Sequence, residues 1–279
     1  MIKIALPNKG QLFDRTMDIM LACGYRINKA HRSLSTIDQE NEVEFFFLRP
    51  LDIPIYVANG ILDAGITGQD FVAEKGLLPV CLYPLNYGYS KLCAAAPVEL
   101  GAQSFADLAG LRIATSFPNL TAAKLHSSNR VVVLEGAVEI SVKLGIADAV
   151  VDIVETGSTL KQAGLAVIGE PLFESRAALF AHPGREHQPE LITLRNRLEG
   201  KVLAQEYLMV EFDCPSTILR EACEITPGIE SPTVMSLAKP GWSSVKSMVK
   251  RRDAQRIMDM LARLGCRGIL LSSLESVRI

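Results

Sequence analysis

The sequence has 279 residues, of which 48% are hydrophobic and 22% charged, an ordinary globular composition that predicts two or three compact units. The formal net charge of -2 gives no overall positive field for nucleic acid. The basic residues are dispersed apart from Lys250–Arg252, which we interpret as a solvated helix start. No apolar run approaches the ~20 residues that span a bilayer. Composition therefore argues against a nucleic-acid-binding or membrane-spanning protein.

The chain opens on an apolar run, Ile2–Leu6, without the charged region or cleavage site of a secretory signal. We therefore expect a cytoplasmic protein. The six cysteines lie far apart without a CxxC pair, and the four histidines lack metal-ligand spacing. Reduced thiols and no zinc site are expected.

The first third of the chain alternates short apolar runs with amphipathic segments. The predicted elements are a strand over 2–6, a helix over 11–23, a strand over 44–48, a helix capped by Asp52, and a strand over 64–66 that enters the turn 67–70 and another helix. This βαβ rhythm predicts a parallel sheet.

A second α/β unit follows residue 90. Its predicted elements are strands over 91–96, 111–114, 130–134 and 149–154, a short helix capped by Ser104, a helix from about 121, a helix over 137–144, and a helix over 160–163. Each strand runs into a polar or glycine-containing loop, and open α/β sheets bind ligands at such carboxyl ends. Two similar lobes with a cleft between them are expected.

The last quarter of the sequence has a different pattern of apolar residues. Its predicted elements are a strand over 206–212, a helix over 215–225, strands over 231–237 and 243–249, a helix capped by Asp253, and a strand over 267–271. The order βαββαβ is the ferredoxin-like signature. Appended to a two-lobed unit, such a module is expected to regulate or assemble the protein.

The segment 148–160 is the strongest local feature. An apolar strand delivers Asp152 and Glu155 to the turn Thr156–Thr159, whose N–H groups and hydroxyls suit a phosphate monoester. The two carboxylates can accept hydrogen bonds from sugar hydroxyls or hold Mg²⁺ through water. Ribose phosphate fits both halves. The turn is equally consistent with a plain helix N-cap at Ser158 or Thr159 and solvated carboxylates.

Other polar turns follow strands that we expect to point at the same cleft. They are Lys9–Gly10, Arg49–Pro50, Thr67–Asp70 and Thr115–Thr121. Lys9 and Arg49 can neutralise a polyphosphate, although either can instead be an ordinary surface residue. No Ser/His/Asp or Cys/His arrangement is legible, which suits a displacement that needs alignment and charge stabilisation rather than a protein nucleophile.

At these residues the sequence resembles the ATP phosphoribosyltransferases in their long form. The resembling segments are Ala5–Gly10, Arg49–Pro54, Gly65–Gly68, Gly136–Glu139, Asp152–Gly164 and Gly228–Thr233. The resemblance implies two catalytic lobes of the type II periplasmic-binding-protein kind, over 1–88 with 178–203 and over 89–177, and a ferredoxin-like regulatory domain over 204–279. It also implies Mg²⁺ as cofactor, histidine as feedback inhibitor, and a hexamer in exchange with a dimer.

Site residues are implied by the same resemblance, position by position. The phosphoribosyl pyrophosphate (PRPP) site takes Asp152, Glu155, Thr156, Gly157, Ser158 and Thr159. The ATP site takes Lys9, Gly10, Arg49, Thr67, Gly68, Asp70 and Lys91. The histidine site takes Asp213, Ile229, Ser231, Thr233 and Leu271. Lys9, Arg49, Asp152 and Glu155 are expected to be catalytic, with Mg²⁺ held by Asp152 and Glu155 through water.

Two of these positions depart from the family pattern. Lys91 replaces an expected arginine, so a planar bidentate contact is absent there, and Leu271 replaces a smaller residue and narrows the expected effector pocket.

The implied reaction is attack of adenine N1 of ATP on ribose C1 of PRPP, with inversion and loss of pyrophosphate, at the first step of histidine synthesis. Because adenine N1 already carries a lone pair, no general base is expected. Two alternatives stay open. One is a two-lobed ligand-binding or effector-binding protein without chemistry, against which stand the missing signal peptide and helix-turn-helix segment. The other is a catalytically silent homologue, which should lack the PRPP loop.

Overall fold

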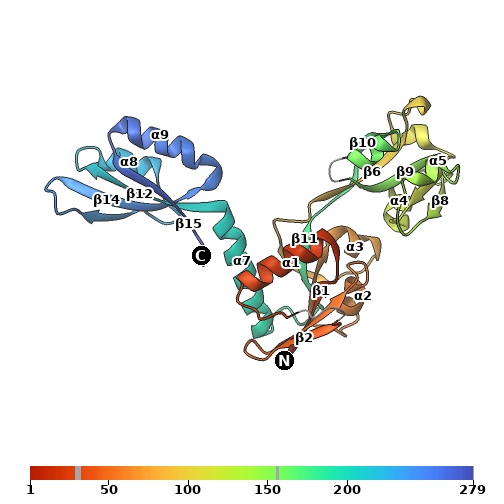
Figure 1. Ribbon diagram of the computed structural model, residues 1–279, viewed down its shortest axis with the longest axis horizontal. Coiled ribbons are helices and arrows are strands. Elements are labelled where there is room, and N and C mark those ends of the chain that lie inside the picture. The colour runs from red at the N-terminus through yellow and green to blue at the C-terminus, as the bar shows by residue number, and fades with distance from the viewer. Residues whose placement is uncertain (29–32, 155–156, 279) are drawn as a thin grey trace. The chain divides into compact units, whose positions relative to one another are not determined.

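The computed structural model describes residues 1–28, 33–154 and 157–278. Contacts divide the chain into two units, Met1–Arg195 and Asn196–Ile279, and helix α7 (Pro189–Glu206) crosses the boundary. The first unit is built on two sheets and the second on one (Figure 1). We call the parts around the first two sheets lobe I and lobe II.

Lobe I contains a mixed sheet with the order β2-β3-β1-β4-β11-β5. Its strands are β1 (Ile2–Pro7), β2 (Ser35–Asp38), β3 (Val43–Leu48), β4 (Ala64–Gly68), β5 (Val80–Pro84) and β11 (Ala177–Ala181). Its helices are α1 (Gly10–Ala22), α2 (Ile53–Ala58) and α3 (Gln69–Glu74). Strand β1 pairs in parallel with β3 and β4, whereas β11 is antiparallel to both of its neighbours.

Lobe II contains a sheet with the order β10-β6-β9-β7-β8. Its strands are β6 (Ser90–Pro97), β7 (Arg112–Thr115), β8 (Arg130–Val133), β9 (Ala149–Val154) and β10 (Leu165–Ser175). Its helices are η1 (Val98–Leu100), η2 (Phe105–Leu108), α4 (Pro118–Lys124), α5 (Ile140–Lys143) and α6 (Ser158–Gln162). Strand β7 is parallel to β8 and β9, and β6 is antiparallel to β9 and β10.

The two lobes repeat one strand order. In lobe I the run β3-β1-β4-β11-β5 and in lobe II the run β8-β7-β9-β6-β10 each place three parallel strands beside an antiparallel strand that arrives from the other lobe. This is the type II periplasmic-binding-protein order, as expected. The parallel sheet that the βαβ rhythm predicted is confirmed for three strands of each lobe, whereas β11 and β6 are antiparallel because each enters its sheet from the other lobe.

The helix starts are less well predicted than the strands. Asp52 and Asp253 make no side-chain capping hydrogen bond to α2 and to α9 (Ala254–Leu264), and both have helical backbone angles. Ser104 does begin η2, where its N–H donates to Asp107 Oδ2 at 2.8 Å. Helix α4 begins at Pro118, a residue that suits a first helical turn, rather than near Thr121.

The second unit contains the sheet β13-β14-β12-β15, which is the ferredoxin-like order. Its elements are β12 (Tyr207–Pro215), α8 (Leu219–Ile225), β13 (Thr233–Ser236), β14 (Trp242–Lys250), η3 (Arg251–Asp253), α9 (Ala254–Leu264) and β15 (Arg267–Ser273). Helices α8 and α9 lie on the same face of the sheet (Figure 1). Alternate residues of β12 and β14 are buried toward that face, which confirms the predicted βαββαβ module.

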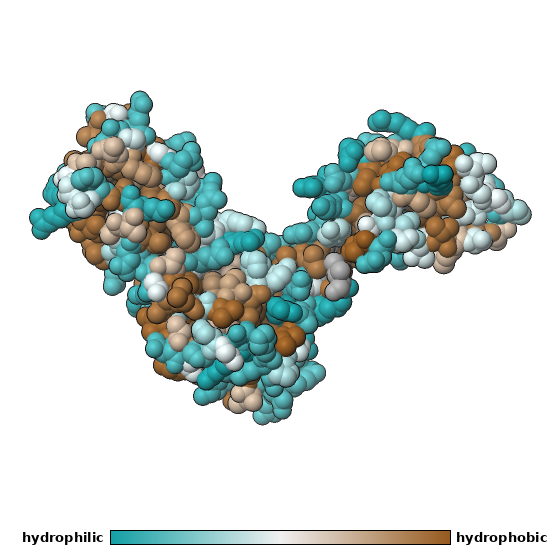
Figure 2. Space-filling model, turned by 180° about the vertical axis from the view of Figure 1, so that it is seen from behind, coloured by the Kyte–Doolittle hydropathy of each residue, from teal (hydrophilic) through white to brown (hydrophobic). Residues whose placement is uncertain are grey.

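No helix among the described residues is long and apolar enough to cross a membrane. On the face shown in Figure 2, hydrophilic residues are interspersed with apolar ones over the whole chain.

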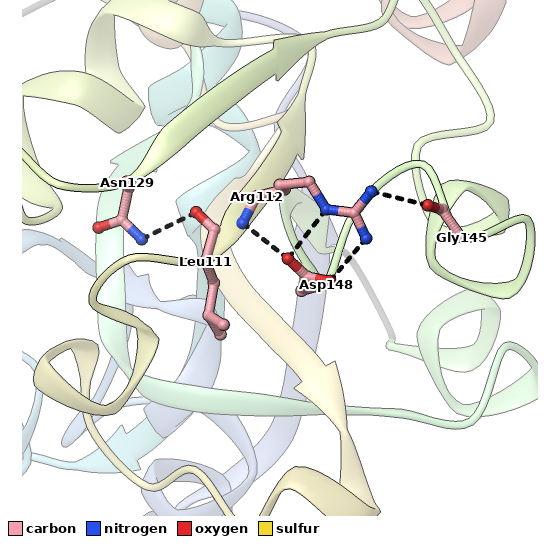
Figure 3. Close-up of polar contacts among 5 residues, drawn as sticks. All are labelled: Leu111, Arg112, Asn129, Gly145 and Asp148. Carbon is pink, nitrogen blue, oxygen red and sulfur yellow. Dashed lines mark hydrogen bonds and ion pairs between the residues drawn. The ribbon is translucent and has the colours of Figure 1, made fainter.

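An ion pair fixes the start of strand β9 in lobe II. The Arg112 guanidinium donates to both oxygens of Asp148, at 3.1 Å from Nε and 2.7 Å from Nη2 (Figure 3). The Arg112 main-chain N–H donates to the same carboxylate at 2.9 Å, and Nη1 donates to the Gly145 carbonyl at 2.8 Å. The hydrogen bonds from Arg112 hold the pKa of Asp148 below its usual value. Strand β9 therefore begins at a fixed point beside β7.

We expect Asp148→Asn to lower the thermal midpoint by a few degrees at pH 7. A lowered folded-state pKa contributes stability above the unfolded value of about 3.9 that is lost as the pH falls further, so the difference from wild type should shrink below about pH 4. Thermal unfolding from pH 3 to 8, with the exposed Glu99→Gln as control, measures it. Equal midpoints for Asp148→Asn and wild type at pH 7 would contradict this role.

Candidate functional site

Asp152 lies near the carboxyl end of β9 and is half-buried. Its Oδ1 accepts the N–H of Ile153 at 2.8 Å. Desolvation raises its pKa, the Ile153 hydrogen bond opposes that effect, and the charge of Glu139 adds to it. Partial burial thus makes the ionised form of Asp152 less favourable, and a bound cation or hydroxyl donors would stabilise it.

The turn that follows β9 contains Gly157 and leads directly into α6. Gly157 has φ +72°, a left-handed conformation that favours glycine, and a Cβ placed there would lie 3.7 Å from the Val154 side chain. Ser158 and Thr159 are exposed at the first helical positions. Glu155 and Thr156, which the sequence assigns to the same loop, lie outside the described residues.

Glu139 is a further candidate residue, which the sequence analysis did not assign to a site. It lies after β8 in the segment Gly136–Glu139, where Ala137 adopts φ 49°, an uncommon conformation for alanine. Its charge helps to raise the pKa of the Asp152 carboxyl. The signal was the resemblance of 136–139 to the family.

In lobe I the charged loops after β1 and β3 share one edge of the sheet. Because Pro7 pairs with Leu48 in parallel register, Lys9 and Arg49 follow neighbouring strand ends. Both are exposed, and Gly10 begins α1 at φ +77° with open space around it. The structure therefore brings these two predicted cations to the same edge.

The segment 67–70, which the sequence predicts to be a substrate-binding turn, makes its contacts within the protein. Strand β4 extends through Gly68, and the buried Thr67 donates its hydroxyl to the Pro50 carbonyl at 2.8 Å. A side chain at Gly68 would collide with the Asp70 carboxylate. Asp70 is itself buried, which raises its pKa. The Thr67 hydroxyl thus fixes the loop that carries Arg49.

Two other predicted positions are already engaged within the protein. Lys91 Nζ lies 2.8 Å from Glu174 Oε1 across the β6–β10 pair, and this hydrogen bond raises the pKa of the lysine. In the turn 115–121, Phe117 N–H donates to Thr115 Oγ1 at 2.9 Å, and the two threonine hydroxyls lie 3.2 Å apart. That turn therefore directs its hydroxyls inward.

The predicted effector residues of the second unit divide between the two faces of its sheet. Asp213 alternates with the buried residues of β12, so it lies on the face away from the helices. Thr233 pairs with Lys246, the register partner of Glu211, and shares that open face. A side chain at Gly268 would come within 3.6 Å of Asp213 Oδ2, so the glycine leaves room beside the carboxylate.

Leu271 lies on the opposite face from Asp213. It pairs with the buried Val210 and packs against the core beneath the helices, whereas its neighbour Leu270 pairs with Glu211 and is 62% exposed. Ile229 and Ser231 are exposed in the loop before β13. Leu270, and not Leu271, therefore lies on the same face of the sheet as Asp213 and Thr233. Strand register is needed to tell the two leucines apart.

The fold is that of a two-lobed α/β protein with a glycine turn and exposed cationic residues after its strand ends and an appended ferredoxin-like domain. The family model for ATP phosphoribosyltransferase matches residues 49–200, and the model for the HisG C-terminal domain matches 204–276. The chain belongs to the ATP phosphoribosyltransferase family.

Individual relatives agree over the whole chain. ATP phosphoribosyltransferases from Saccharopolyspora erythraea and Mycobacterium tuberculosis are each 44% identical over 282 and 284 residues, which is 100% of both chains in each comparison. A solved chain of the ATP phosphoribosyl transferase (HisG:HisZ) complex from Thermotoga maritima is 28% identical with a TM-score of 0.62, and the match covers 71% of this chain and 97% of that one.

Replacing Asp152 should separate activity from stability. Because its folded-state pKa is raised, ionisation destabilises the fold as the pH rises through that value, so Asp152→Asn should raise the thermal midpoint at pH 7.5 by about 1–2 °C. The same change should lower turnover about a hundredfold or more. Unfolding scans and initial rates measure both, with Asp148→Asn as the comparison that loses stability. A variant with wild-type turnover would remove Asp152 from the site.

Proposed function

We propose that the protein transfers the phosphoribosyl group of PRPP to N1 of ATP, forming phosphoribosyl-ATP and pyrophosphate at the first step of histidine biosynthesis. One observation carries the proposal: β9 ends in a partly desolvated carboxylate beside a left-handed glycine turn, in a chain of this family. We also propose the division into 1–88 with 178–203, 89–177 and 204–279, and a cytoplasmic location.

Lobe II would hold PRPP and lobe I would hold ATP. The 5′-phosphate would bind the N–H groups and hydroxyls of Gly157, Ser158 and Thr159, together with Thr156, while Asp152 and Glu155 accept hydrogen bonds from the ribose hydroxyls. Lys9 and Arg49 would meet the triphosphate from one sheet edge, with Gly10, Gly68 and Asp70 beside them. Lys91 could join only by leaving Glu174.

The reaction requires the two substrates to be aligned and the charges of the transition state to be stabilised. As the bond from ribose C1 to pyrophosphate breaks, positive charge develops on the ribose and negative charge on the leaving group, so fixed carboxylates on one side and cations on the other both favour the transition state. Adenine N1 attacks through its own lone pair. The main task of the residues is to hold C1 and N1 in line.

The donor set suits Mg²⁺. Asp152 would supply a hard oxygen ligand, the charge of Glu139 would add to the local negative potential, and a cation would offset the desolvation that raises the pKa of Asp152. The described residues contain no group of three side chains able to cage a metal, so Mg²⁺ would be held by Asp152 and Glu155 largely through water and substrate. When bound, the ion would neutralise charge on the departing pyrophosphate.

The second unit would bind histidine as a feedback inhibitor through Asp213, Ile229, Ser231 and Thr233. A carboxylate beside Gly268 suits the ammonium or imidazolium of histidine. The role of Leu271 stays a prediction, since its side chain packs under the helices. We further propose a homo-oligomer, a hexamer in exchange with a dimer, through which the effector acts.

The direct test of the activity is incubation of the full chain with ATP, PRPP and Mg²⁺. We expect pyrophosphate and phosphoribosyl-ATP in equal amounts, and no product when any of the three is omitted. Binding of both substrates without product would favour a catalytically silent homologue. Binding of neither would favour a two-lobed binding protein for another ligand.

Asp213→Ala should weaken histidine inhibition selectively. Loss of a charged contact worth about 1.5–3 kcal/mol should raise the inhibitory concentration of histidine about ten- to a hundredfold and leave the uninhibited rate nearly unchanged. Glu211→Ala is the matched control, since Glu211 lies two residues away on the same face. Unchanged inhibition in Asp213→Ala would exclude this residue, and a wild type indifferent to histidine would end the regulatory proposal.

A further inference from the structure

Helix α3 belongs to lobe I by its strand but packs against both lobes. Val72 lies in a cluster with Ala178 and Phe180 of β11, in lobe I. Phe71 packs against the core of lobe II and stacks on Phe117, with ring centroids 5.8 Å apart and an angle of 23° between planes. The six-residue helix α3 thus connects the two lobes outside the crossover segments.

Glu74, at the end of this helix, caps a helix of the other lobe. Its Oε1 accepts the N–H of Asn119 at 2.9 Å, and its Oε2 accepts the N–H of Leu120 at 3.0 Å. Pro118, the first residue of α4, has no N–H to satisfy. One carboxylate from lobe I therefore takes the free donors at the second and third positions of a lobe II helix.

The capping is reciprocal. The Asn119 side-chain amide donates to the Glu74 main-chain carbonyl at 2.8 Å, so each helix end is satisfied by a residue of the other lobe. Glu74 is only 3% exposed. Both oxygens of this buried carboxylate accept hydrogen bonds. If Glu74 moved away from Asn119 and Leu120, the carboxylate and two N–H groups would be left buried without partners, which is unfavourable.

The same helix is also bound to the crossover segments. Its first residues donate to the returning segment, Gln69 N–H to the Arg176 carbonyl and Asp70 N–H to Ser175 Oγ, both at 3.0 Å. Helix α3 is therefore fixed at its start to the crossover and at its end to α4. A rotation of lobe II about the crossover segments would have to move Asn119 and Leu120 relative to Glu74.

We propose that Glu74 is a positioning residue that sets the orientation of lobe II relative to lobe I, and so the alignment of the two substrates. It touches neither substrate in this account. Its effect comes through α4 and the stacked phenylalanines. The kinetic part of the test rests on the proposed function, whereas the exchange measurement below does not.

The kinetic test compares Glu74→Ala, Glu74→Gln and the exposed lobe II control Glu99→Ala in the full chain. Glutamine keeps the size but turns an amide donor toward an N–H, so it should retain one bond and give an intermediate effect. We expect kcat to fall about tenfold or more in Glu74→Ala. The dissociation constants of ATP alone and PRPP alone should stay within about twofold of wild type, since each site lies on one lobe.

Two kinetic results would overturn the proposal. One is a kcat for Glu74→Ala equal to that of the Glu99→Ala control. The other is a parallel loss of kcat and of single-substrate binding, which is the behaviour of a locally unfolded lobe. If Glu74→Ala does not fold, the same two comparisons apply to Glu74→Gln.

Hydrogen exchange gives a readout that needs no activity. In Glu74→Ala or Glu74→Gln, faster exchange is expected at Asn119 and Leu120 and also in the crossover segments, including the Ala177 N–H, while β7 and β9 stay protected. Faster exchange confined to α4 would make Glu74 a local helix cap and overturn the positioning role. An inactive wild type with the expected exchange pattern would count against the proposed function and not against this inference.

Discussion

The chain crosses between the first two sheets twice, and the two crossing segments are hydrogen bonded to each other. Ala177 N–H donates to the Tyr87 carbonyl at 3.0 Å, and Leu85 N–H donates to the Ala177 carbonyl at 2.8 Å. The Tyr87 hydroxyl lies 2.9 Å from Thr16 Oγ1, which ties the outgoing segment to α1. This paired crossing makes β6 and β11 antiparallel to the strands beside them, and it leaves the carboxyl ends of the parallel strands to carry the functional loops.

Each lobe holds its candidate site residues by different physical means. In lobe II the Arg112–Asp148 pair fixes the start of β9, and Asp152 lies near the end of the strand, before the glycine turn. In lobe I strand register alone sets Lys9 and Arg49 side by side, with the Thr67 hydroxyl bracing the second loop. In both lobes the strands therefore hold the main chain of the candidate residues in place.

The sequence predicted most strands, the two-lobed order and the βαββαβ module, because apolar runs and turn residues report strands directly. Strands β2, β5 and β10 were not predicted, since none has a clean alternation of apolar and polar residues, and β11 depends on a return from the other lobe. The reach of Glu74 to α4, 45 residues away, has no local signal. The opposite facing of Leu270 and Leu271 needs strand register, which pattern alone does not fix.

The proposed function assigns PRPP to lobe II and ATP to lobe I. Hydrogen exchange of the full chain with each substrate alone tests this most directly. PRPP alone should protect the peptide 148–164 in lobe II and leave 7–12 and 49–52 unchanged, whereas ATP alone should protect the lobe I peptides and leave 148–164 unchanged. Protection of the lobe I peptides by PRPP alone, or of 148–164 by ATP alone, would contradict the assignment of substrates to lobes.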